Sequence, residues 1–314
     1  MPDVPLPSTS VVICCYTEDR TEQVLEAAAS VARQSFAATE IIVVCDHNPT
    51  LEAVLHTALP DCRVIPNRET RGLSGARNSG ARIAKSDVVS FLDDDAVASD
   101  DWLERLIEPF ADSRVTVVGG AVDPIWASER PVWFPDEFGW VVGYSHRGVP
   151  TQRATVRNPF GGNMAIRVEA LHAVGGFRSG IGRVGTRPVG GEETDVCIRL
   201  LRARPETLVV FEPSARIAHH IPASRTTLRY FVARCYHEGI SKAQLAAYSG
   251  ASRALSEERR YVRHVVPEAV TRGVQAAFRG QVASGLGKAG AVVTGVGVFG
   301  VGYLRQSVAG ELWR

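Results

Sequence analysis

The stretch Asp87–Asp95, with the sequence DVVSFLDDD, decides the fold class of this chain. Its run Val88–Leu92 is nearly continuous in apolar residues, which is typical of a strand buried on both faces. Three carboxylates, Asp93, Asp94 and Asp95, follow the strand directly. Because open α/β sheets bind ligands at the carboxyl ends of their strands, the stretch predicts an α/β fold with a polar site at this sheet edge.

The same alternation of strand and helix patterns precedes this stretch. Apolar runs at Val11–Cys15 and Ile41–Cys45 predict two further buried strands. Helical spacing of apolar residues follows them, at Thr21–Gln34 and Leu51–Leu59. Repeated strand–helix units require right-handed crossovers, so we expect a mainly parallel sheet flanked by helices.

The composition is that of a soluble globular protein, and it excludes disorder and coiled coil. The chain has 314 residues, of which 45% are hydrophobic and 22% charged. The segment 123–158 is rich in Pro and aromatic residues without clear periodicity, and is either a functional loop or a packed cluster. From Thr226 onward the pattern is helical only. We therefore expect a catalytic α/β domain at 1–224 and a helical extension at 225–314.

The charges of these two regions differ in sign. Residues 225–314 hold 13 Lys and Arg against 5 Asp and Glu, whereas residues 1–224 hold 22 against 29. The stretch Ala289–Leu304 carries no charge over 16 residues, which is shorter than the roughly 20 that span a bilayer. We expect either peripheral membrane contact through 272–305 or a terminal helix packed on the body, and no nucleic acid partner.

The compartment follows from the cysteines and the N-terminus. Six cysteines show no C-x-x-C spacing, and three of them lie inside apolar strand patterns. This usage favours a reducing compartment. The N-terminal segment has no basic start followed by an apolar run, so a signal peptide is not expected. We expect a cytoplasmic protein, peripheral on the inner face of the membrane.

The Asp triplet predicts a divalent cation. Three adjacent carboxylates repel one another, and carboxylate oxygens suit Mg²⁺ or Mn²⁺ together with oxygens of a diphosphate. In an extended backbone Asp93 and Asp95 would share a side and Asp94 would point elsewhere. The alternative is a set of helix-capping acids in a turn. Either His219 or His220, which point to opposite faces of a strand, is a further candidate ligand.

A second acidic set opens a predicted helix after Gly190 and Gly191. Its members are Glu192, Glu193 and Asp195. Carboxylates in a first turn are stabilised by the helix dipole, which is one explanation. The other is a general base that takes the proton of an attacking hydroxyl. Elsewhere, Asp46 can accept hydrogen bonds from a base ring, and Arg77 at a helix start suits phosphate.

In this order, the motifs SVVICCYTEDR, IIVVCDHN, RGLSGARNSGARIAKSDVVSFLDDD, GGNMAIR, GGF and GGEETDVCIRLL resemble the family 2 glycosyltransferases of the Rossmann-like GT-A fold. The resemblance covers roughly residues 8–222. It implies an inverting, metal-assisted transfer of a sugar from a nucleotide donor, most simply a UDP-sugar. The acceptor stays open between a lipid-linked or cell-surface glycan and a natural-product scaffold, with 123–159 expected to set its selectivity.

The resemblance also implies roles for individual positions. It implies Mg²⁺ or Mn²⁺ at Asp93, Asp95 and His219. Glu193 occupies the place of the usual base, although a Glu there leaves Glu192 and Asp195 open as alternatives. The residues implied for the nucleotide sugar are Tyr16, Glu18, Asp46, Arg77, Asp93, Asp94, Gly162 and Asn163.

Two other functions fit parts of this pattern. A nucleotidyltransferase also places metal-binding carboxylates on an α/β sheet, but it resembles a pattern with a Gly-rich loop after the first strand, where this chain has CCYTEDR. A non-catalytic nucleotide- or carbohydrate-binding module would not need both acidic sets. The sequence therefore favours the transferase.

Overall fold

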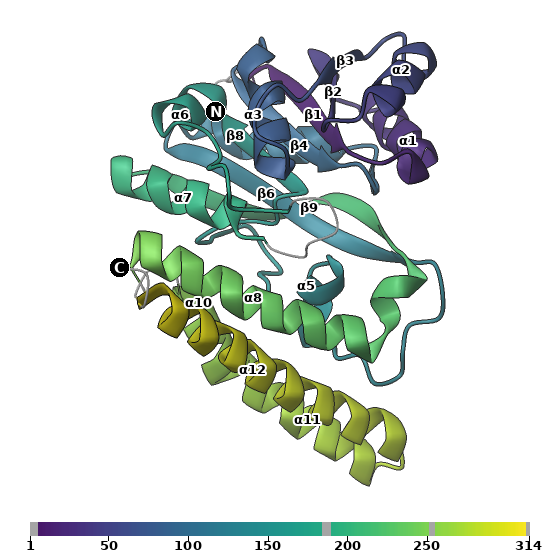
Figure 1. Ribbon diagram of the computed structural model, residues 1–314, viewed down its shortest axis with the longest axis vertical. Helices are drawn as coiled ribbons and strands as arrows, with labels where there is room; N and C mark the ends of the chain where they lie inside the picture. Colours follow the sequence, from purple (N-terminus) through teal and green to yellow (C-terminus); the bar gives the residue numbers. More distant parts are fainter. Residues whose placement is uncertain (1–5, 184–189, 251–254, 312–314) are drawn as a thin grey trace. The chain divides into compact units, whose positions relative to one another are not determined.

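The computed structural model describes residues 6–183, 190–250 and 255–311, and the chain divides into two compact units (Figure 1). The first unit comprises Met1–Asp123 and Pro150–His219, and the second comprises Pro124–Val149 and His220–Arg314. The sequence predicts one boundary, near residue 224. The second unit also takes in the aromatic segment, because Phe134 and Phe138 of that segment pack against Phe231 of the C-terminal region.

The described residues form a nine-stranded sheet in the order β3-β2-β1-β4-β8-β6-β9-β5, with β7 paired to β9. The strands are β1 (Thr9–Cys15), β2 (Glu40–Cys45), β3 (Arg63–Pro66), β4 (Val88–Asp93), β5 (Ala96–Ala98), β6 (Val115–Trp126), β7 (Ala154–Thr155), β8 (Asn163–Arg167) and β9 (Leu208–Ile221).

The α/β fold class is confirmed, and the sheet is mixed. Strands β3, β2, β1 and β4 are parallel. Strand β8 runs antiparallel to β4 and β6, and both β5 and β7 run antiparallel to β9. The sheet is less parallel than the sequence predicts, because only its first four strands are joined by the helical crossovers that the βα pattern marks.

Helices cover the parallel half of the sheet. They are α1 (Thr21–Ala32), α2 (Pro49–Ala58), α3 (Leu73–Ile83), α4 (Trp102–Ile107), α6 (Val168–Ala173) and α7 (Glu192–Ala203), with short 3-10 turns at Glu18–Arg20 and Glu108–Ala111. Helix α3 lies very close to the sheet: a Cβ on Gly80 would be 2.6 Å from Val12 Cγ1. Val12, Val44, Phe91 and Phe177 belong to one buried core with α3, α6 and α7.

The second unit is helical. It contains α5 (Gly139–Val142), α8 (Leu228–Ser249), α10 (Ser256–Arg260), a π-helical turn at Tyr261–Val265, α11 (Val266–Phe278) and α12 (Val282–Glu311), with 3-10 turns at Asp136–Phe138 and Ala223–Thr226. Helices α8 and α12 are in backbone contact, because a Cβ on Gly239 would lie 2.1 Å from the Phe299 carbonyl oxygen. Likewise, a Cβ on Gly302 would lie 2.2 Å from the Tyr236 carbonyl oxygen.

Two sequence expectations concern this unit. The aromatic segment forms a packed cluster, with Phe134, Phe138 and Tyr144 buried. The uncharged stretch Ala289–Leu304 is the centre of a longer helix. By length and composition alone, Val282–Ala309 of this helix, whose most apolar stretch of 18 residues has a mean hydropathy of 1.4, is long and apolar enough to cross a membrane.

Candidate active site

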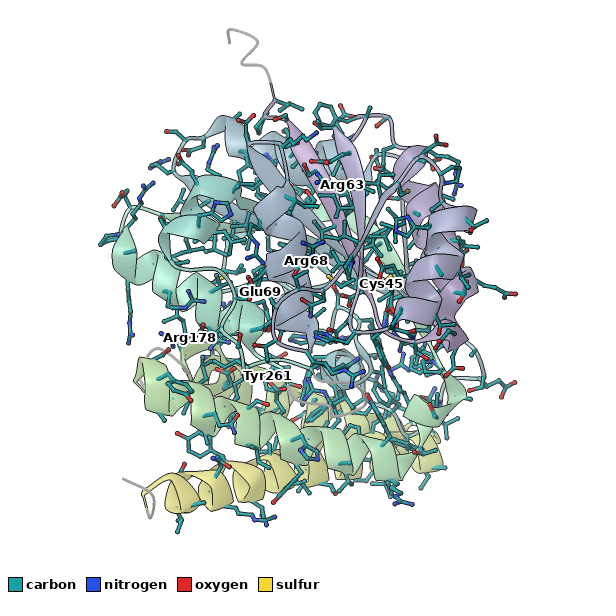
Figure 2. The ribbon with its side chains drawn as sticks, turned by 45° about the horizontal axis from the view of Figure 1, so that its top comes forward. Cys45, Arg63, Arg68, Glu69, Arg178 and Tyr261 are labelled. Carbon is teal, nitrogen blue, oxygen red and sulfur yellow. The ribbon has the colours of Figure 1, made fainter. Side chains whose placement is uncertain are left out.

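The site lies where the parallel strands end. Strands β1, β2 and β4 are in register, so that Cys15 pairs with Cys45 and Cys14 pairs with Asp93. Figure 2 labels Cys45, the last residue of β2. The side chains that follow these strands therefore leave the sheet at one edge, as the sequence predicts.

The Asp triplet forms the turn between β4 and β5. Asp93 is the last residue of β4, and the chain turns through Asp94 and Asp95 before β5 begins at Ala96. Arg20 Nη1 lies 2.8 Å from Asp94 Oδ1 and 2.9 Å from Asp95 Oδ2. The extended backbone that would put Asp93 and Asp95 on one side is therefore absent here, and a turn brings Asp94 and Asp95 to the same guanidinium.

Arg20 balances a crowded pair of carboxylates. Burial and the charge of Asp95 raise the pKa of Asp94 to about 7, and the Arg20 guanidinium opposes that rise. Burial would lower the pKa of Arg20, but Asp94 and Asp95 outweigh it and raise that pKa. Sequence reasoning gave Arg20 no role. The sequence feature that could have indicated Arg20 is the run of three adjacent acids, because carboxylates this close together in a fold need a cation.

A histidine completes this cluster. His219 pairs with Ala96 in the β5–β9 ladder, and its Nε2 lies 3.3 Å from Asp95 Oδ1. Of the two histidines that the sequence left open, His219 is shown beside the Asp triplet. Asp94 Oδ2 is buried and has no hydrogen-bond partner, an acceptor atom that suits a cation.

These residues fit a divalent metal that the substrate helps to bind. Within the described ranges, no group of three or more His, Cys, Asp or Glu side chains is arranged to hold a metal by itself. Mg²⁺ and Mn²⁺ are usually held by one or two protein carboxylates plus phosphate oxygens and water. Asp95 and His219 together supply such a partial donor set.

Arg77 joins the two acidic motifs. The side chain is buried, with Nη1 2.9 Å from Glu192 Oε1 and Nη2 3.5 Å from Asp93 Oδ1. Its guanidinium carbon lies 5.7 Å from the ring centre of Phe91 and 5.6 Å from that of Phe177. Glu192 and Asp93 outweigh burial and raise the pKa of Arg77. The sequence assigned this guanidinium to phosphate. In the structure it is held by the carboxylates of Glu192 and Asp93 and by the rings of Phe91 and Phe177.

Gly162 and Asn163 play different parts from one another. A Cβ on Gly162 would lie 2.1 Å from Asp93 Oδ2, so only glycine lets the backbone approach this carboxylate. The Asn163 side chain is fully buried: it accepts from Trp102 Nε1 at 2.8 Å and donates to the carbonyls of Ala121 and Ala215, each at 2.9 Å. Asn163 therefore does not line a ligand cleft, contrary to the sequence expectation, because its amide is used within the sheet.

The three acids of α7 have distinct surroundings. Asp195 is 0% exposed and is held by Arg178 Nη1 at 3.1 Å and Arg199 Nε at 2.8 Å; Figure 2 labels Arg178. Glu192 is buried against Arg77. Glu193 is only half-buried, and its Oε1 accepts a hydrogen bond from Thr194 Oγ1 at 3.2 Å. Of the three candidates for a base, Glu193 is the one with an accessible side chain.

The residues predicted to hold a base lie at the ends of β1 and β2. Asn48 donates to Glu18 Oε2 at 3.0 Å, which lowers the pKa of this exposed acid. Tyr16 lies under the Arg20 guanidinium, 5.7 Å from its ring centre. Asp46 is buried and accepts hydrogen bonds from Asn67 Nδ2 at 2.6 Å and from the Gly72 amide at 2.9 Å. Both Asp46 oxygens therefore also hold the loop before α3.

The comparison with known proteins begins at the sequence level. Residues 10–175 match the model of the family described as glycosyl transferase family 2. A glucosyl-dolichyl phosphate glucuronosyltransferase of Haloferax volcanii is 35% identical over 237 residues, which are 74% of this chain and 75% of that protein. A pre-mycofactocin glycosyltransferase of Mycobacterium tuberculosis is 30% identical over 187 residues, which are 59% of this chain and 37% of that protein.

Solved structures share the fold. The mannosyltransferase PcManGT from Pyrobaculum calidifontis, in complex with GDP-Man and Mn²⁺, aligns with a TM-score of 0.58 and 16% identity over 96% of this chain and 90% of that one. GalNAc-T7 with UDP, GalNAc and Mn²⁺ aligns with a TM-score of 0.56 and 17% identity over 83% of this chain and 58% of that one. At such identities the likeness establishes the fold alone.

The family assignment rests on the sequence matches and agrees with the fold. The family match covers more than half of the chain, and the Haloferax relative is similar over about three quarters of both proteins. The sheet edge carries the two acidic motifs that the sequence singled out. This chain is therefore a member of glycosyl transferase family 2, a glycosyltransferase with the GT-A fold.

Proposed function

We propose that this protein transfers a sugar, with inversion at the anomeric carbon, from a UDP-sugar to a hydroxyl of a lipid-linked acceptor, with the catalytic residues within 1–224. The observation that carries the proposal is the cluster at the sheet edge, where His219 Nε2 lies 3.3 Å from Asp95 Oδ1 and Arg20 contacts Asp94 and Asp95. Such a cluster suits a polyanionic ligand that arrives with a cation.

The donor nucleotide would lie along the ends of the parallel strands. Tyr16, Glu18 and Asp46 follow β1 and β2 and are positioned to contact a base, while Asp93 faces Gly162, where a sugar or ribose hydroxyl can approach. Two nucleotides have support from structures of the same fold, which are complexes with UDP and with GDP-Man. We place UDP first and GDP second.

The divalent ion would be held by Asp95 and His219, with Asp94 and Asp93 nearby. Mg²⁺ or Mn²⁺ bound there supplies charge neutralisation for the diphosphate as it leaves. The chain's own residues then keep the cluster in place: Arg20 holds Asp94 and Asp95, and Arg77 holds Asp93.

The base of the proposed reaction is Glu193. An acceptor hydroxyl is a poor nucleophile near neutral pH, so a carboxylate must take its proton as the oxygen attacks the anomeric carbon. Glu192 is engaged by Arg77, and Asp195 is engaged by Arg178 and Arg199. Attack opposite the leaving diphosphate inverts the centre in one displacement and needs one base, whereas retention by double displacement needs a carboxylate nucleophile as well.

The acceptor class is proposed from the sequence relatives. The Haloferax relative, matched over three quarters of both chains, is named for a dolichyl phosphate lipid. A lipid-linked acceptor would place the protein at the inner face of the membrane, in agreement with the basic region 225–314. A small natural-product acceptor is the second candidate, favoured by the similarity to the pre-mycofactocin enzyme over a shorter part of both chains.

The deciding experiment is calorimetric titration of the full chain with UDP, GDP and TDP, each with Mn²⁺ and with EDTA. We expect Mn²⁺-dependent binding of UDP, and a loss of more than about tenfold in affinity, or 1.4 kcal/mol, in Asp95→Ala. The control Asp61→Ala, at an exposed carboxylate in the same unit, should bind as the unmodified chain does. Equal binding in EDTA would contradict the metal, and binding of GDP alone would replace UDP as the donor base.

A further inference from the structure

Helix α12 carries an exposed stripe of apolar side chains along its whole length. The stripe consists of Val282, Leu286, Val293, Val301, Leu304 and Val308, each between 54% and 65% exposed. At 3.6 residues per turn, these six positions lie within about 100° of one another around the helix axis. Gly290 and Gly297 fall within the same arc, with open space where a Cβ would be. The α12 stripe is therefore one continuous apolar face.

The opposite face of α12 is fixed to the other helices of the second unit. The close approaches of Gly239 to Phe299 and of Gly302 to Tyr236 join α12 to α8. A Cβ on Gly285 would lie 2.4 Å from the Gly273 carbonyl oxygen, so α12 also touches the backbone of α11. Figure 1 shows α12 running along α8 and α11. The α12 stripe packs on neither α8 nor α11, so its apolar side chains are exposed and can contact another surface.

This packing argues against a membrane span. A spanning helix must be apolar all round or packed on apolar neighbours, whereas α8 carries Arg234 and Glu238, paired at 2.7 Å, and Lys242, paired with Glu258 at 2.9 Å. Helix α12 cannot enter the hydrocarbon without taking α8 along or separating from it. A helix with one exposed apolar face, packed on a helix that carries ion pairs, instead lies in the membrane interface.

The charged residues along the α12 stripe are all basic, which favours contact with an anionic surface. Between Val270 and Gly310 the sequence contains no Asp or Glu, and its charged residues are Arg272, Arg279, Lys288 and Arg305. Arg279 precedes the stripe beside Phe278, which is 89% exposed, and Arg305 lies next to Leu304 at the other end. Basic side chains at the ends of an apolar face reach phosphate headgroups while their stems stay on the apolar side.

We propose that the α12 stripe docks in the interface of a bilayer that contains anionic phospholipids, with α12 parallel to the membrane plane. Arg279 and Arg305 contact the phosphates, and the apolar side chains of the stripe lie among the upper acyl carbons. This docking specifies the membrane location that the proposed function invokes and rests on it for its purpose. The docking itself is measured without sugar transfer.

The first test is flotation of the full chain with vesicles. The vesicles are phosphatidylcholine alone, or about two parts phosphatidylcholine to one part phosphatidylglycerol. We expect the chain to float with the anionic vesicles, to float less with the neutral ones, and to be released by high salt or by alkaline carbonate, as an interfacial protein is. Failure to float with anionic vesicles, or resistance to carbonate, would overturn the proposal; carbonate resistance would indicate a span.

A matched pair of variants locates the contact. Val293→Glu with Val301→Glu puts two charges into the stripe, and Val54→Glu with Thr57→Glu puts the same two charges on the exposed face of α2. The stripe variant should lose at least about tenfold in vesicle partitioning, since two charges in an interfacial apolar face oppose burial, while the α2 variant should float as the unmodified chain does. Equal flotation of the two variants would overturn the proposal.

Three further measurements separate the remaining outcomes. Arg279→Gln with Arg305→Gln should remove most of the preference for anionic vesicles, and an unchanged preference contradicts the headgroup contact.

Sedimentation of the unmodified chain tests whether a second copy of the chain covers the stripe. A dimer that the stripe variant abolishes, without vesicle binding, would overturn membrane docking. Calorimetry with UDP on the stripe variant reports on the first unit, so loss of nucleotide binding and loss of docking are told apart.

Discussion

The two units differ in what their interiors are made of. The first unit gathers buried charges from separate elements at one sheet edge, where Arg77 of α3 meets Glu192 of α7 and Arg20 meets Asp94 and Asp95. The second unit has ion pairs along α8 and between Arg272 and Glu137, but its core is filled mainly with aromatic rings and glycine contacts. Buried charge from distant segments is costly to assemble, so its concentration in the first unit marks where chemistry is organised.

Within the first unit, the three acids of α7 differ in how far they are buried. Asp195 and Glu192 each have an arginine at hydrogen-bond distance and are buried. Glu193 shares their motif but is half-buried and turned toward Thr194. A general base must reach substrate and change protonation, which a buried carboxylate held by arginine does poorly. The contrast between these neighbours is open to direct test.

The largest effect is expected for Glu193→Gln. The amide keeps the shape of the side chain but cannot take a proton, so turnover should fall about 10²- to 10⁴-fold, or about 3–5 kcal/mol in activation free energy. Donor KM and the urea unfolding midpoint should stay unchanged, since Glu193 is half-buried. Initial rates of UDP release, measured with a UDP-sugar and a lipid-linked acceptor, check this.

The matched control is Glu206→Gln, an exposed glutamate in the loop after α7. It should retain full turnover. If Glu193→Gln also retains turnover while Glu192→Gln loses it, the base is Glu192 and the assignment by exposure fails. If both keep turnover, Asp195 is the remaining candidate for the base in the α7 motif.

The next effect, on stability, is expected for Asp195→Asn. Neutralising this fully buried carboxylate removes the negative charge with which the largely buried Arg199 is paired, while Arg178 is half-exposed and screened by solvent. The free energy of unfolding should fall by about 3 kcal/mol, which urea titration at fixed temperature measures. Asp112→Asn, at an exposed pair with Arg114, should leave the midpoint where it is. A stable Asp195→Asn chain with base-like loss of turnover would reverse the roles of Asp195 and Glu193.

The sequence predicts those parts of the fold and site that depend on neighbours along the chain. Strand β4 and its three acids are adjacent in sequence, and so are the acids of α7, so periodicity and spacing suffice. The family resemblance rests on the same local motifs, and the comparisons confirm it.

The parts that the sequence misses depend on distant pairs. Arg20 reaches Asp94 across 74 residues, and Arg77 reaches Glu192 across 115. No pattern of neighbouring residues predicts which arginine makes either contact. The burial of Asn163 against Trp102 was not predicted for the same reason, since the two residues are 61 positions apart. The antiparallel half of the sheet was missed because its strands are joined without the helical crossovers that mark a βαβ unit.

The second unit offers a further predicted effect, on the pH dependence of stability, and it arises from the partly buried His146. His146 lies against Tyr261, with ring centres 5.7 Å apart, and burial lowers its pKa from 6.5 to about 4. Between these pH values the unfolded chain binds a proton on this histidine that the folded chain does not. Stability from His146 is therefore complete above about pH 6.5 and is lost as the pH falls toward 4, by at most about 1.4 kcal/mol per pH unit.

The measurement is the urea unfolding free energy between pH 7 and pH 4 for the unmodified chain, His146→Phe and His264→Phe. Phenylalanine keeps a ring against Tyr261 and cannot be protonated, so His146→Phe should lose part of the acid slope. His264 is exposed in the same unit, and its replacement should leave the slope as it is. Equal slopes in all three chains would mean that the acid sensitivity comes from the charge clusters of the first unit. The buried charges of that unit would then determine the pH dependence of the unfolding free energy as well as the chemistry.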